Sequence, residues 1–484
     1  AVGQGTLAAN TTGEYNAAVG AYALDANTTA NYNTAVGYES STTNTTGASN
    51  TSVGRRSLKL NTTGSNNVAI GQNCLESNTT ADNNTAVGKS ALEQNTTGTS
   101  NVAVGAYALD ANTTASNNTC VGYAALTANT TGSTNVAVGQ ASLTSNTTGS
   151  SNTALGQGAL NNNTTADNNT AVGKYALEAN TTGVSNVAVG ANALDANTTG
   201  GANTAVGKDA LGANTTAANN TAVGFSCLIK NTTGNNNTGL GAYSFEDNTT
   251  GANNTGLGYF ALGNNTTAGE NTAIGYAALL GNTTQDDNTA VGRVALEQNQ
   301  AANNTAVGSN ALTVTTTGAN NTAVGSNALK SNTTGQDNIA LGYQALYSTT
   351  TYSYQIAIGR NALYSHNSSS VGNVAIGYLA MTSATTGHET VAVGYQALRQ
   401  VGQGTQGANQ ENTAIGYQAG DGATAGASNV GIGYQSLSGT MAANASYNTA
   451  VGHQAAAPTL CSPIPTRKMP VRSPQQGTPR ALLA

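Results

Sequence analysis

The side chains best suited to chemistry in this sequence are asparagines that begin the triplet Asn-Thr-Thr, an acceptor pattern for N-linked sugars. The triplet recurs 17 times at 17-residue spacing from Asn10 to Asn282, and Asn332 begins one more. The candidate glycosylation sites are Asn10, Asn27, Asn44, Asn61, Asn78, Asn95, Asn112, Asn129, Asn146, Asn163, Asn180, Asn197, Asn214, Asn231, Asn248, Asn265, Asn282 and Asn332. A second acceptor pattern, Asn-Asn-Thr, begins at Asn83, Asn117, Asn168, Asn219, Asn236, Asn253, Asn303 and Asn320.

The Asn-Thr-Thr triplets have an alternative role in turn and ladder hydrogen bonds, because Asn side chains bend the chain and pair along stacked strands. Stacked coils lie about 4.8 Å apart, which crowds bulky glycans on one row. In either role, the identical spacing predicts that Asn78, Asn95, Asn112, Asn129 and Asn146 share one line on the outside of the molecule.

Other reactive residue types show no arrangement typical of a catalytic, cofactor or metal site. Acids recur at one repeat position (Asp25, Glu76, Glu93, Asp110, Glu178, Asp195, Glu246, Glu297), but the Gly-Gly-x-Gly-x-Asp pattern of calcium-binding rolls is missing, which favours a solvated edge. His366, His388 and His453 have no nucleophile or carboxylate at telling positions. We therefore expect no catalytic residues, no cofactor, no metal and no enzyme activity.

The four cysteines lack metal-ligand spacing. Cys74, Cys120 and Cys227 occupy positions where Ala is usual, so we expect small buried hydrophobic side chains there. Two further patterns bear on binding. Adjacent threonines point to opposite faces, which disfavours the flat Thr rows of an ice-binding surface. Tyrosines at 343, 347, 352, 354 and 364 coincide with loss of Asn-Thr-Thr and suggest either a ligand-binding patch or variant packing.

Composition excludes several classes of protein. Only 7% of the 484 residues are charged, against about 25% in an ordinary globular domain. The net charge is −6, so the chain has no basic footprint for nucleic acid. No apolar run approaches the ~18 residues of a membrane helix. The sequence begins inside a repeat without a signal peptide, and we expect it to be a fragment or a processed product.

The elements that position these residues are 27 repeats of the form Asn-Thr-Ala-Val-Gly-Tyr-x-Ala-Leu-x-x-Asn-Thr-Thr-Gly-x-x. The Gly that ends Ala-Val-Gly, called here the row glycine, recurs every 17 residues from Gly3 to Gly292, and its spacing loosens afterwards as far as Gly452. Residues 20–104 also align with residues 105–189, which are five repeats further on. Block duplication of this kind is typical of a repeat protein, in which each unit contacts only its neighbours.

One repeat predicts one coil of two short strands and two turns. Thr-Ala-Val alternates as a strand does, and the Leu four residues after the row glycine is a second apolar anchor. We expect Val87, Leu92, Val104, Leu109 and their equivalents to point inward, with the Ala face covered by another chain. A second Gly follows Asn-Thr-Thr in most repeats. Because Ala replaces it in several others, positive φ is not obligatory there.

The pattern at Val136-Ala137-Val138-Gly139 and Val374-Ala375-Ile376-Gly377 resembles the head repeats of trimeric autotransporter adhesins. The longer form, at Asn412-Thr413-Ala414-Ile415-Gly416-Tyr417-Gln418-Ala419, is similar to repeats of phage tail fibres and surface fibre proteins. The resemblance covers residues 1–456 and implies a parallel β-roll with three chains in each head. The adhesin repeat is shorter, so the Asn-Thr-Thr-Gly turn is extra.

The sequence thus predicts an all-β, repetitive parallel β-solenoid or β-roll with one 17-residue coil per repeat, in a trimeric or other multi-chain fibre. We expect a regular solenoid over 1–299, a degenerate one with insertions over 300–456, and a Pro-rich basic tail over 457–484 that is disordered or artefactual. The predicted function is an extracellular structural fibre or adhesin segment on a cell or virion surface, self-associated and carrying glycans. Alternatives are a receptor- or glycan-binding shaft of a phage fibre and, more remotely, an ice-binding solenoid.

Overall fold

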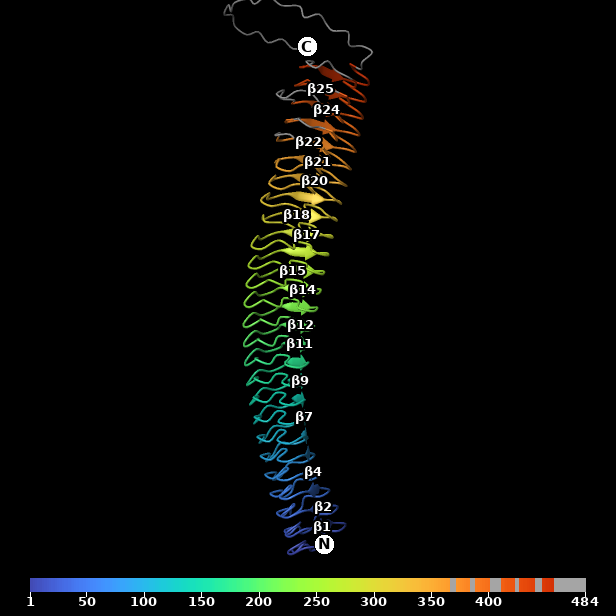
Figure 1. The fold of residues 1–484 in the computed structure, drawn as a ribbon. Coiled ribbons are helices and arrows are strands. Elements are labelled where there is room, and N and C mark those ends of the chain that lie inside the picture. The colour runs from blue at the N-terminus through green and yellow to red at the C-terminus, as the bar shows by residue number, and fades with distance from the viewer. Residues whose placement is uncertain (366–370, 384–387, 401–410, 423–425, 440–445, 457–484) are drawn as a thin grey trace, which may run out of the picture.

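The computed structural model is a single rod of stacked coils (Figure 1). It describes residues 1–365, 371–383, 388–400, 411–422, 426–439 and 446–456. Each coil after the first, which has only a bridge at Val2, holds one three-residue strand. The strands form one 26-stranded parallel sheet in which each pairs with the next along the chain. The described residues contain no helix. The prediction of a parallel solenoid with one coil per repeat is confirmed.

The strands are β1 (Ala17–Val19), β2 (Thr34–Val36), β3 (Thr51–Val53), β4 (Val68–Ile70), β5 (Thr85–Val87), β6 (Val102–Val104), β7 (Thr119–Val121), β8 (Val136–Val138), β9 (Thr153–Leu155), β10 (Thr170–Val172), β11 (Val187–Val189), β12 (Thr204–Val206), β13 (Thr221–Val223), β14 (Thr238–Leu240), β15 (Thr255–Leu257), β16 (Thr272–Ile274), β17 (Thr289–Val291), β18 (Thr305–Val307), β19 (Thr322–Val324), β20 (Ile339–Leu341), β21 (Ile356–Ile358), β22 (Val374–Ile376), β23 (Val391–Val393), β24 (Thr413–Ile415), β25 (Val430–Ile432) and β26 (Thr449–Val451).

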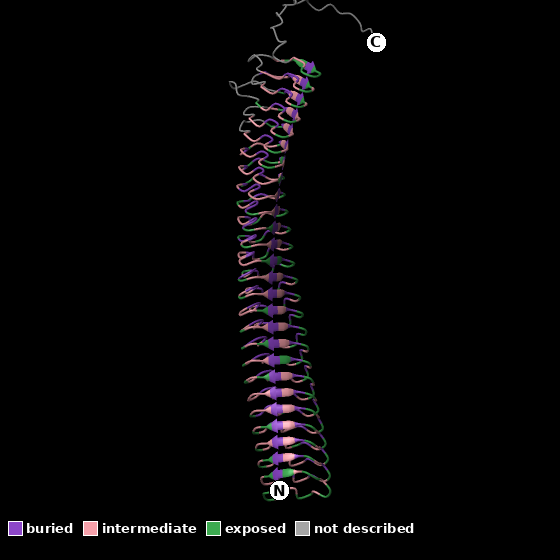
Figure 2. Cartoon of the chain, turned by 90° about the vertical axis from the view of Figure 1, so that its right-hand side faces the viewer, coloured by how far each residue is buried: buried purple, intermediate pink, exposed green. Residues whose placement is uncertain are grey.

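The orientation predicted for the strands is wrong. In every strand the middle residue is buried and the two outer residues are half-buried or exposed, as in β6, where Ala103 is fully buried between Val102 and Val104. The strand Ala therefore faces the core, and the Val faces outward. In Figure 2 the strands are accordingly purple in the middle and pink or green at their ends. The prediction for the Leu row is confirmed, since Leu92 and Leu109 are fully buried.

In the coils as far as the structure describes them, the predicted second strand is also absent, and a tight turn takes its place. In the coil of Gly88, Ser90 and Leu92 both have φ of 54°, and Ser100 has φ of 58°. The turn repeats with Leu in the left-handed region in almost every coil, although that region costs a residue with a Cβ roughly 1–2 kcal/mol. Backbone bonds between coils offset this cost: the Leu92 N–H donates to the Ala108 carbonyl at 3.0 Å.

The second Gly of the repeat has ordinary backbone geometry. Gly98, for example, does not have positive φ, and Ala115 lies buried at the same position of the next coil. The inference that this position does not require positive φ is confirmed.

The number of residues in a coil changes along the chain without disturbing the strand register. The step between paired strands falls to 16 residues from Thr289 to Thr305 and rises to 22 from Val391 to Thr413, yet the middle residues stay aligned. Much of the added length falls in residues 401–410, outside the described ranges. The tail predicted for 457–484 also lies outside the described residues.

Candidate binding surfaces and modification sites

The Asn of each Asn-Thr-Thr triplet points into the solenoid. Asn78, Asn95 and Asn112 are fully buried, as are the other candidate glycosylation sites from Asn27 to Asn332; Asn10, in the first coil, is half-buried. The predicted shared line is therefore confirmed, and its predicted place on the outside is wrong. An unpaired amide is costly to bury, but these amides are paired, so burial of the row is tolerated.

The buried row is a hydrogen-bond ladder. The Asn95 Nδ2 donates to Asn78 Oδ1 at 3.0 Å and to the Gly98 carbonyl at 2.9 Å, and Asn112 Nδ2 repeats the pattern one coil on. Both amide hydrogens are thus engaged. An N-linked sugar would replace one of them inside a fully buried site, so glycosylation of this row conflicts with the folded coil.

The second acceptor pattern lies on the surface. Asn83, Asn117, Asn168, Asn219, Asn236, Asn253, Asn303 and Asn320 are all exposed, with φ near 60°. The next residue in each repeat is buried: Asn101 donates through Nδ2 to the Ala115 carbonyl at 2.9 Å, and its backbone N–H donates to Asn84 Oδ1 at 2.9 Å. The two sequon rows therefore differ in accessibility, which the sequence motif alone does not reveal.

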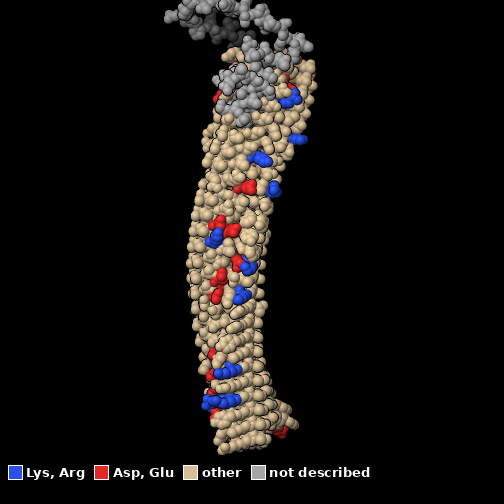
Figure 3. Space-filling model, in the orientation of Figure 1, with Lys and Arg blue, Asp and Glu red and all other residues tan. Residues whose placement is uncertain are grey.

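The outer face of the sheet is a long uncharged strip. All first and third strand residues are Thr, Val, Ile, Leu or, at Ala17, Ala. Charged side chains are few in the face shown in Figure 3, where several of the Lys and Arg side chains lie close to Asp or Glu. The strip offers methyl groups and, in the Thr-rich coils, hydroxyl groups in two parallel rows.

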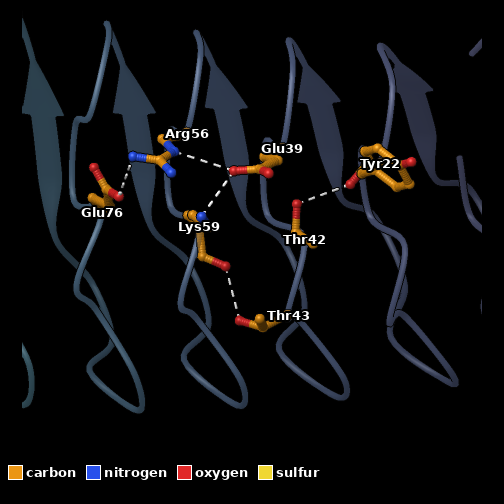
Figure 4. A network of polar contacts seen from close by, with 7 residues as sticks. All are labelled: Tyr22, Glu39, Thr42, Thr43, Arg56, Lys59 and Glu76. Carbon is orange, nitrogen blue, oxygen red and sulfur yellow. Dashed lines mark hydrogen bonds and ion pairs between the residues drawn. The ribbon is translucent and has the colours of Figure 1, made fainter. Parts of the chain in front are cut away.

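Ion pairs concentrate near the N-terminal end (Figure 4). Glu39 accepts contacts from Lys59 Nζ at 2.8 Å and Arg56 Nε at 3.2 Å, and Arg56 Nη1 lies 3.7 Å from Glu76 Oε1. The hydrogen bond from Lys59 is the main cause that lowers the pKa of Glu39 to about 2. These four side chains, called here the charge clamp, link three successive coils.

The clamp lies beside a gap in the apolar core. Ser41 stands where other coils have Leu, and its hydroxyl lies 2.8 Å from that of Ser52, which also accepts from Ser40 Oγ at 2.7 Å. The core clusters on the two sides of this coil are separate, one ending at Ala35 and the other starting at Leu58. Hydroxyl pairing and surface charge replace apolar packing here.

The remaining candidates for chemistry are dispersed. Cys74, Cys120 and Cys227 are buried and free, as predicted, and burial raises the pKa of each thiol, to about 12 for Cys74 and Cys227. Within the described ranges, His, Cys, Asp and Glu side chains nowhere gather in groups of three that could hold a metal ion. The acids predicted to form a solvated edge are half-buried, and burial raises the pKa of Asp110 and Asp195.

The tyrosines predicted as a patch occupy different positions in the coil. Tyr347 and Tyr364 stack at 5.0 Å, whereas Tyr343 directly follows a row glycine. A longer column at that last position, from Tyr378 onward, was missed. Its signal was the recurring Gly-Tyr-Gln triplet of the C-terminal repeats.

Comparisons with known proteins add no relative: no family model matches this chain, and no curated protein matches it. In the part of the chain that the structure describes, no helix is long and apolar enough to cross a bilayer.

Proposed function

We propose that this β-solenoid is the shaft of an extracellular fibre, assembled from several copies of the chain and most simply from three, on the surface of a cell or virion. The observation that carries the proposal is the uncharged outer face of the sheet, which follows the whole rod. Residues in such a strip are typical of the core of an interface, where charged side chains are depleted.

The size of the strip supports self-association. Strands about 4.8 Å apart give a strip about 120 Å long, and a width of roughly 10 Å makes its area on the order of 1,000 Å² per chain. A stable interface needs about 800 Å² from each partner. The similarity of Val374-Ala375-Ile376-Gly377 to adhesin head repeats points the same way.

The experiment compares two kinds of substitution in neighbouring positions. Val104→Asp, combined with Val138→Asp and Val172→Asp, places charges on the outer face, so we expect folded monomers by sedimentation velocity and circular dichroism. Ala103→Asp buries an unpaired charge in the core, so we expect local unfolding and increased proteolysis. A monomeric wild-type chain at micromolar concentration would contradict the assembly proposal.

The outward Thr side chains of the same face support a second candidate function, which is ice binding. Thr204, Thr221, Thr238, Thr255, Thr272 and Thr289 lie in successive coils, and each is paired in register with the next. Regularly spaced hydroxyl and methyl groups on a flat sheet can bind the ordered water molecules of an ice surface. The adjacent threonines that disfavour ice binding belong to the Asn-Thr-Thr turns and not to this face of the sheet. Ice binding needs the face exposed, so thermal hysteresis in a monomeric chain would favour this function over the multi-chain shaft.

A further inference from the structure

A column of stacked rings runs along the C-terminal part of the solenoid, directly after the row glycines. Tyr378, Tyr395, Tyr417 and Tyr434 stack with ring centroids 5.0 to 5.2 Å apart, and His453 stacks on Tyr434 at 4.9 Å. The four tyrosines remain about two-fifths exposed. Five successive coils therefore offer an aromatic side chain at the same place.

A ladder of glutamine amides follows four of these five coils one residue later; after Tyr378 the position holds Leu379. Gln418 Nε2 donates to Gln396 Oε1 at 2.8 Å, Gln435 Nε2 to Gln418 Oε1 at 2.9 Å, and Gln454 Nε2 to Gln435 Oε1 at 3.1 Å. Each of these bonds uses one of the two hydrogens on its Nε2. The ladder therefore fixes the orientation of the amides, while the second N–H of Gln418, Gln435 and Gln454 is not used by the ladder and can donate to a ligand.

The stacking decides what the column can bind. Because the ring faces cover one another, the column presents ring edges and phenol hydroxyls, and the edge is the positive part of an aromatic quadrupole. Hydroxyls and amide N–H groups add donors at the same interval. The surface therefore suits an oxygen-rich polymer lying parallel to the rod, with one unit for each coil of about 4.8 Å.

Charge favours a neutral polymer. The Arg360 guanidinium at the start of the column is engaged by Tyr343 and Tyr378, 5.5 and 6.0 Å from the ring centroids. Arg399 is paired with Asp421 at 3.2 Å. The ring contacts leave Arg360 its positive charge, but residues 359–456 hold two Arg against three acids, Glu389, Glu411 and Asp421. This part of the rod is therefore not positively charged overall and does not attract an acidic chain.

We propose that the column Tyr378–Tyr395–Tyr417–Tyr434, with the glutamine ladder beside it, is a binding site for a neutral β-linked glycan that lies along the rod axis. An extended β-1,4-linked glycan advances by a similar step for each sugar, so its hydroxyls meet the column repeatedly. This site would give the proposed shaft a ligand. It is formed by the stacked coils of one chain, so it does not require that several chains assemble.

The test measures binding of the full chain to hydroxyethylcellulose, a neutral β-1,4-glucan, and to alginate, a polymer of uronic acids, by affinity electrophoresis. We expect retention by hydroxyethylcellulose and about a tenfold loss of affinity in Tyr395→Ala/Tyr417→Ala, because central aromatic side chains dominate interface energies. Tyr417→Phe keeps the stack and removes one hydroxyl, so a smaller loss is expected.

Tyr276→Ala is the matched control. Tyr276 also follows a row glycine and is exposed, but Ala277 stands where the column has Gln, so we expect unchanged affinity. Equal binding by the double variant and the wild type, stronger retention by alginate, or no retention by either polymer would overturn the proposal. Circular dichroism checks the fold of each variant, and sedimentation velocity reports assembly separately, so failure of the shaft proposal is distinguishable.

Discussion

The row glycine is the residue least open to substitution. Gly207 has φ of 136°, and a methyl group added to it would lie 2.4 Å from the Gly224 carbonyl oxygen of the next coil. Both backbone conformation and contact between coils therefore exclude a side chain. The same contact recurs along the row, which explains why the glycine period is the clearest feature of the sequence.

We expect Gly207→Ala to destabilise its coil by several kcal/mol, because the clash is with backbone that cannot move without shifting the stack. Gly212→Ala in the same coil is the control. It has ordinary φ and its nearest neighbour would lie at 3.4 Å, so little change in stability is expected. Thermal unfolding and limited proteolysis measure both variants, and equal effects would refute this role for the row glycine.

The two sequon rows give a second prediction for single residues. If the folded chain is treated with an oligosaccharyltransferase, we expect sugar at exposed positions such as Asn83 and Asn117 and none at Asn95 or Asn112, whose amide hydrogens are engaged. Chain unfolded before treatment should accept sugar in both rows. Peptide mass spectrometry locates the sites, and occupancy of Asn95 in folded protein would refute the ladder.

At the scale of the coil, the period and the inward Leu were predictable, whereas the inward face of the strand was not. Alternation in Thr-Ala-Val shows that a strand has two faces but not which of them is buried. A signal was nevertheless present. Phe245 replaces the core Leu, and Gly239 and Gly256 replace Ala in the strands beside it, since a methyl group on Gly256 would lie 2.5 Å from the Phe ring. A larger side chain at the Leu position is thus matched by smaller residues in the middle of the neighbouring strands. This compensation identifies the middle strand residue as part of the core.

The buried Asn ladder breaks where Thr replaces Asn. Thr315 and Thr349 flank Asn332, and among the described residues no hydrogen-bond partner reaches Thr315 Oγ1, Thr349 Oγ1 or Asn332 Oδ1. We expect Thr315→Asn/Thr349→Asn to stabilise the protein by about 1–3 kcal/mol, because buried polar atoms gain partners. Asn112→Thr should cost a similar amount in the regular coils. Thermal unfolding measures both, and a neutral double variant would argue against the ladder as a stabilising element.

The charge clamp makes one part of the rod sensitive to acid. The folded-state pKa of Glu39 is about 2, below its ordinary value of 4.5. Its contribution to stability is therefore complete above about pH 4.5 and is lost as pH falls through about 2. Because the core is interrupted at Ser41, we expect proteolysis by an acid protease to begin near this coil at low pH. Glu39→Gln should be cut there by a neutral protease at neutral pH as well, and unchanged resistance would contradict the role of the clamp.

For the whole molecule, register between coils is set locally. Val391 pairs with Thr413 across 22 residues as regularly as Thr85 pairs with Val102 across 17. Each strand contacts only its two neighbours, so length can change in whole repeats without altering any other contact. The 85-residue duplication in the sequence revealed this property. The turn geometry could not be predicted, because Leu ordinarily avoids the left-handed backbone conformation that it adopts in these turns.

Removing one duplicated block tests this modular design. Deletion of residues 105–189 joins Val104 to Gly190 and restores the Ala-Val-Gly sequence, so we expect a folded rod that is five coils, or about 24 Å, shorter. Deletion of residues 105–181 joins Val104 to Thr182 and brings a turn against a strand, so loss of local structure is expected. Small-angle scattering gives the maximum dimension of each variant. If the in-register deletion unfolded the protein, the rod would depend on contacts beyond neighbouring coils, and a shaft of adjustable length would be excluded.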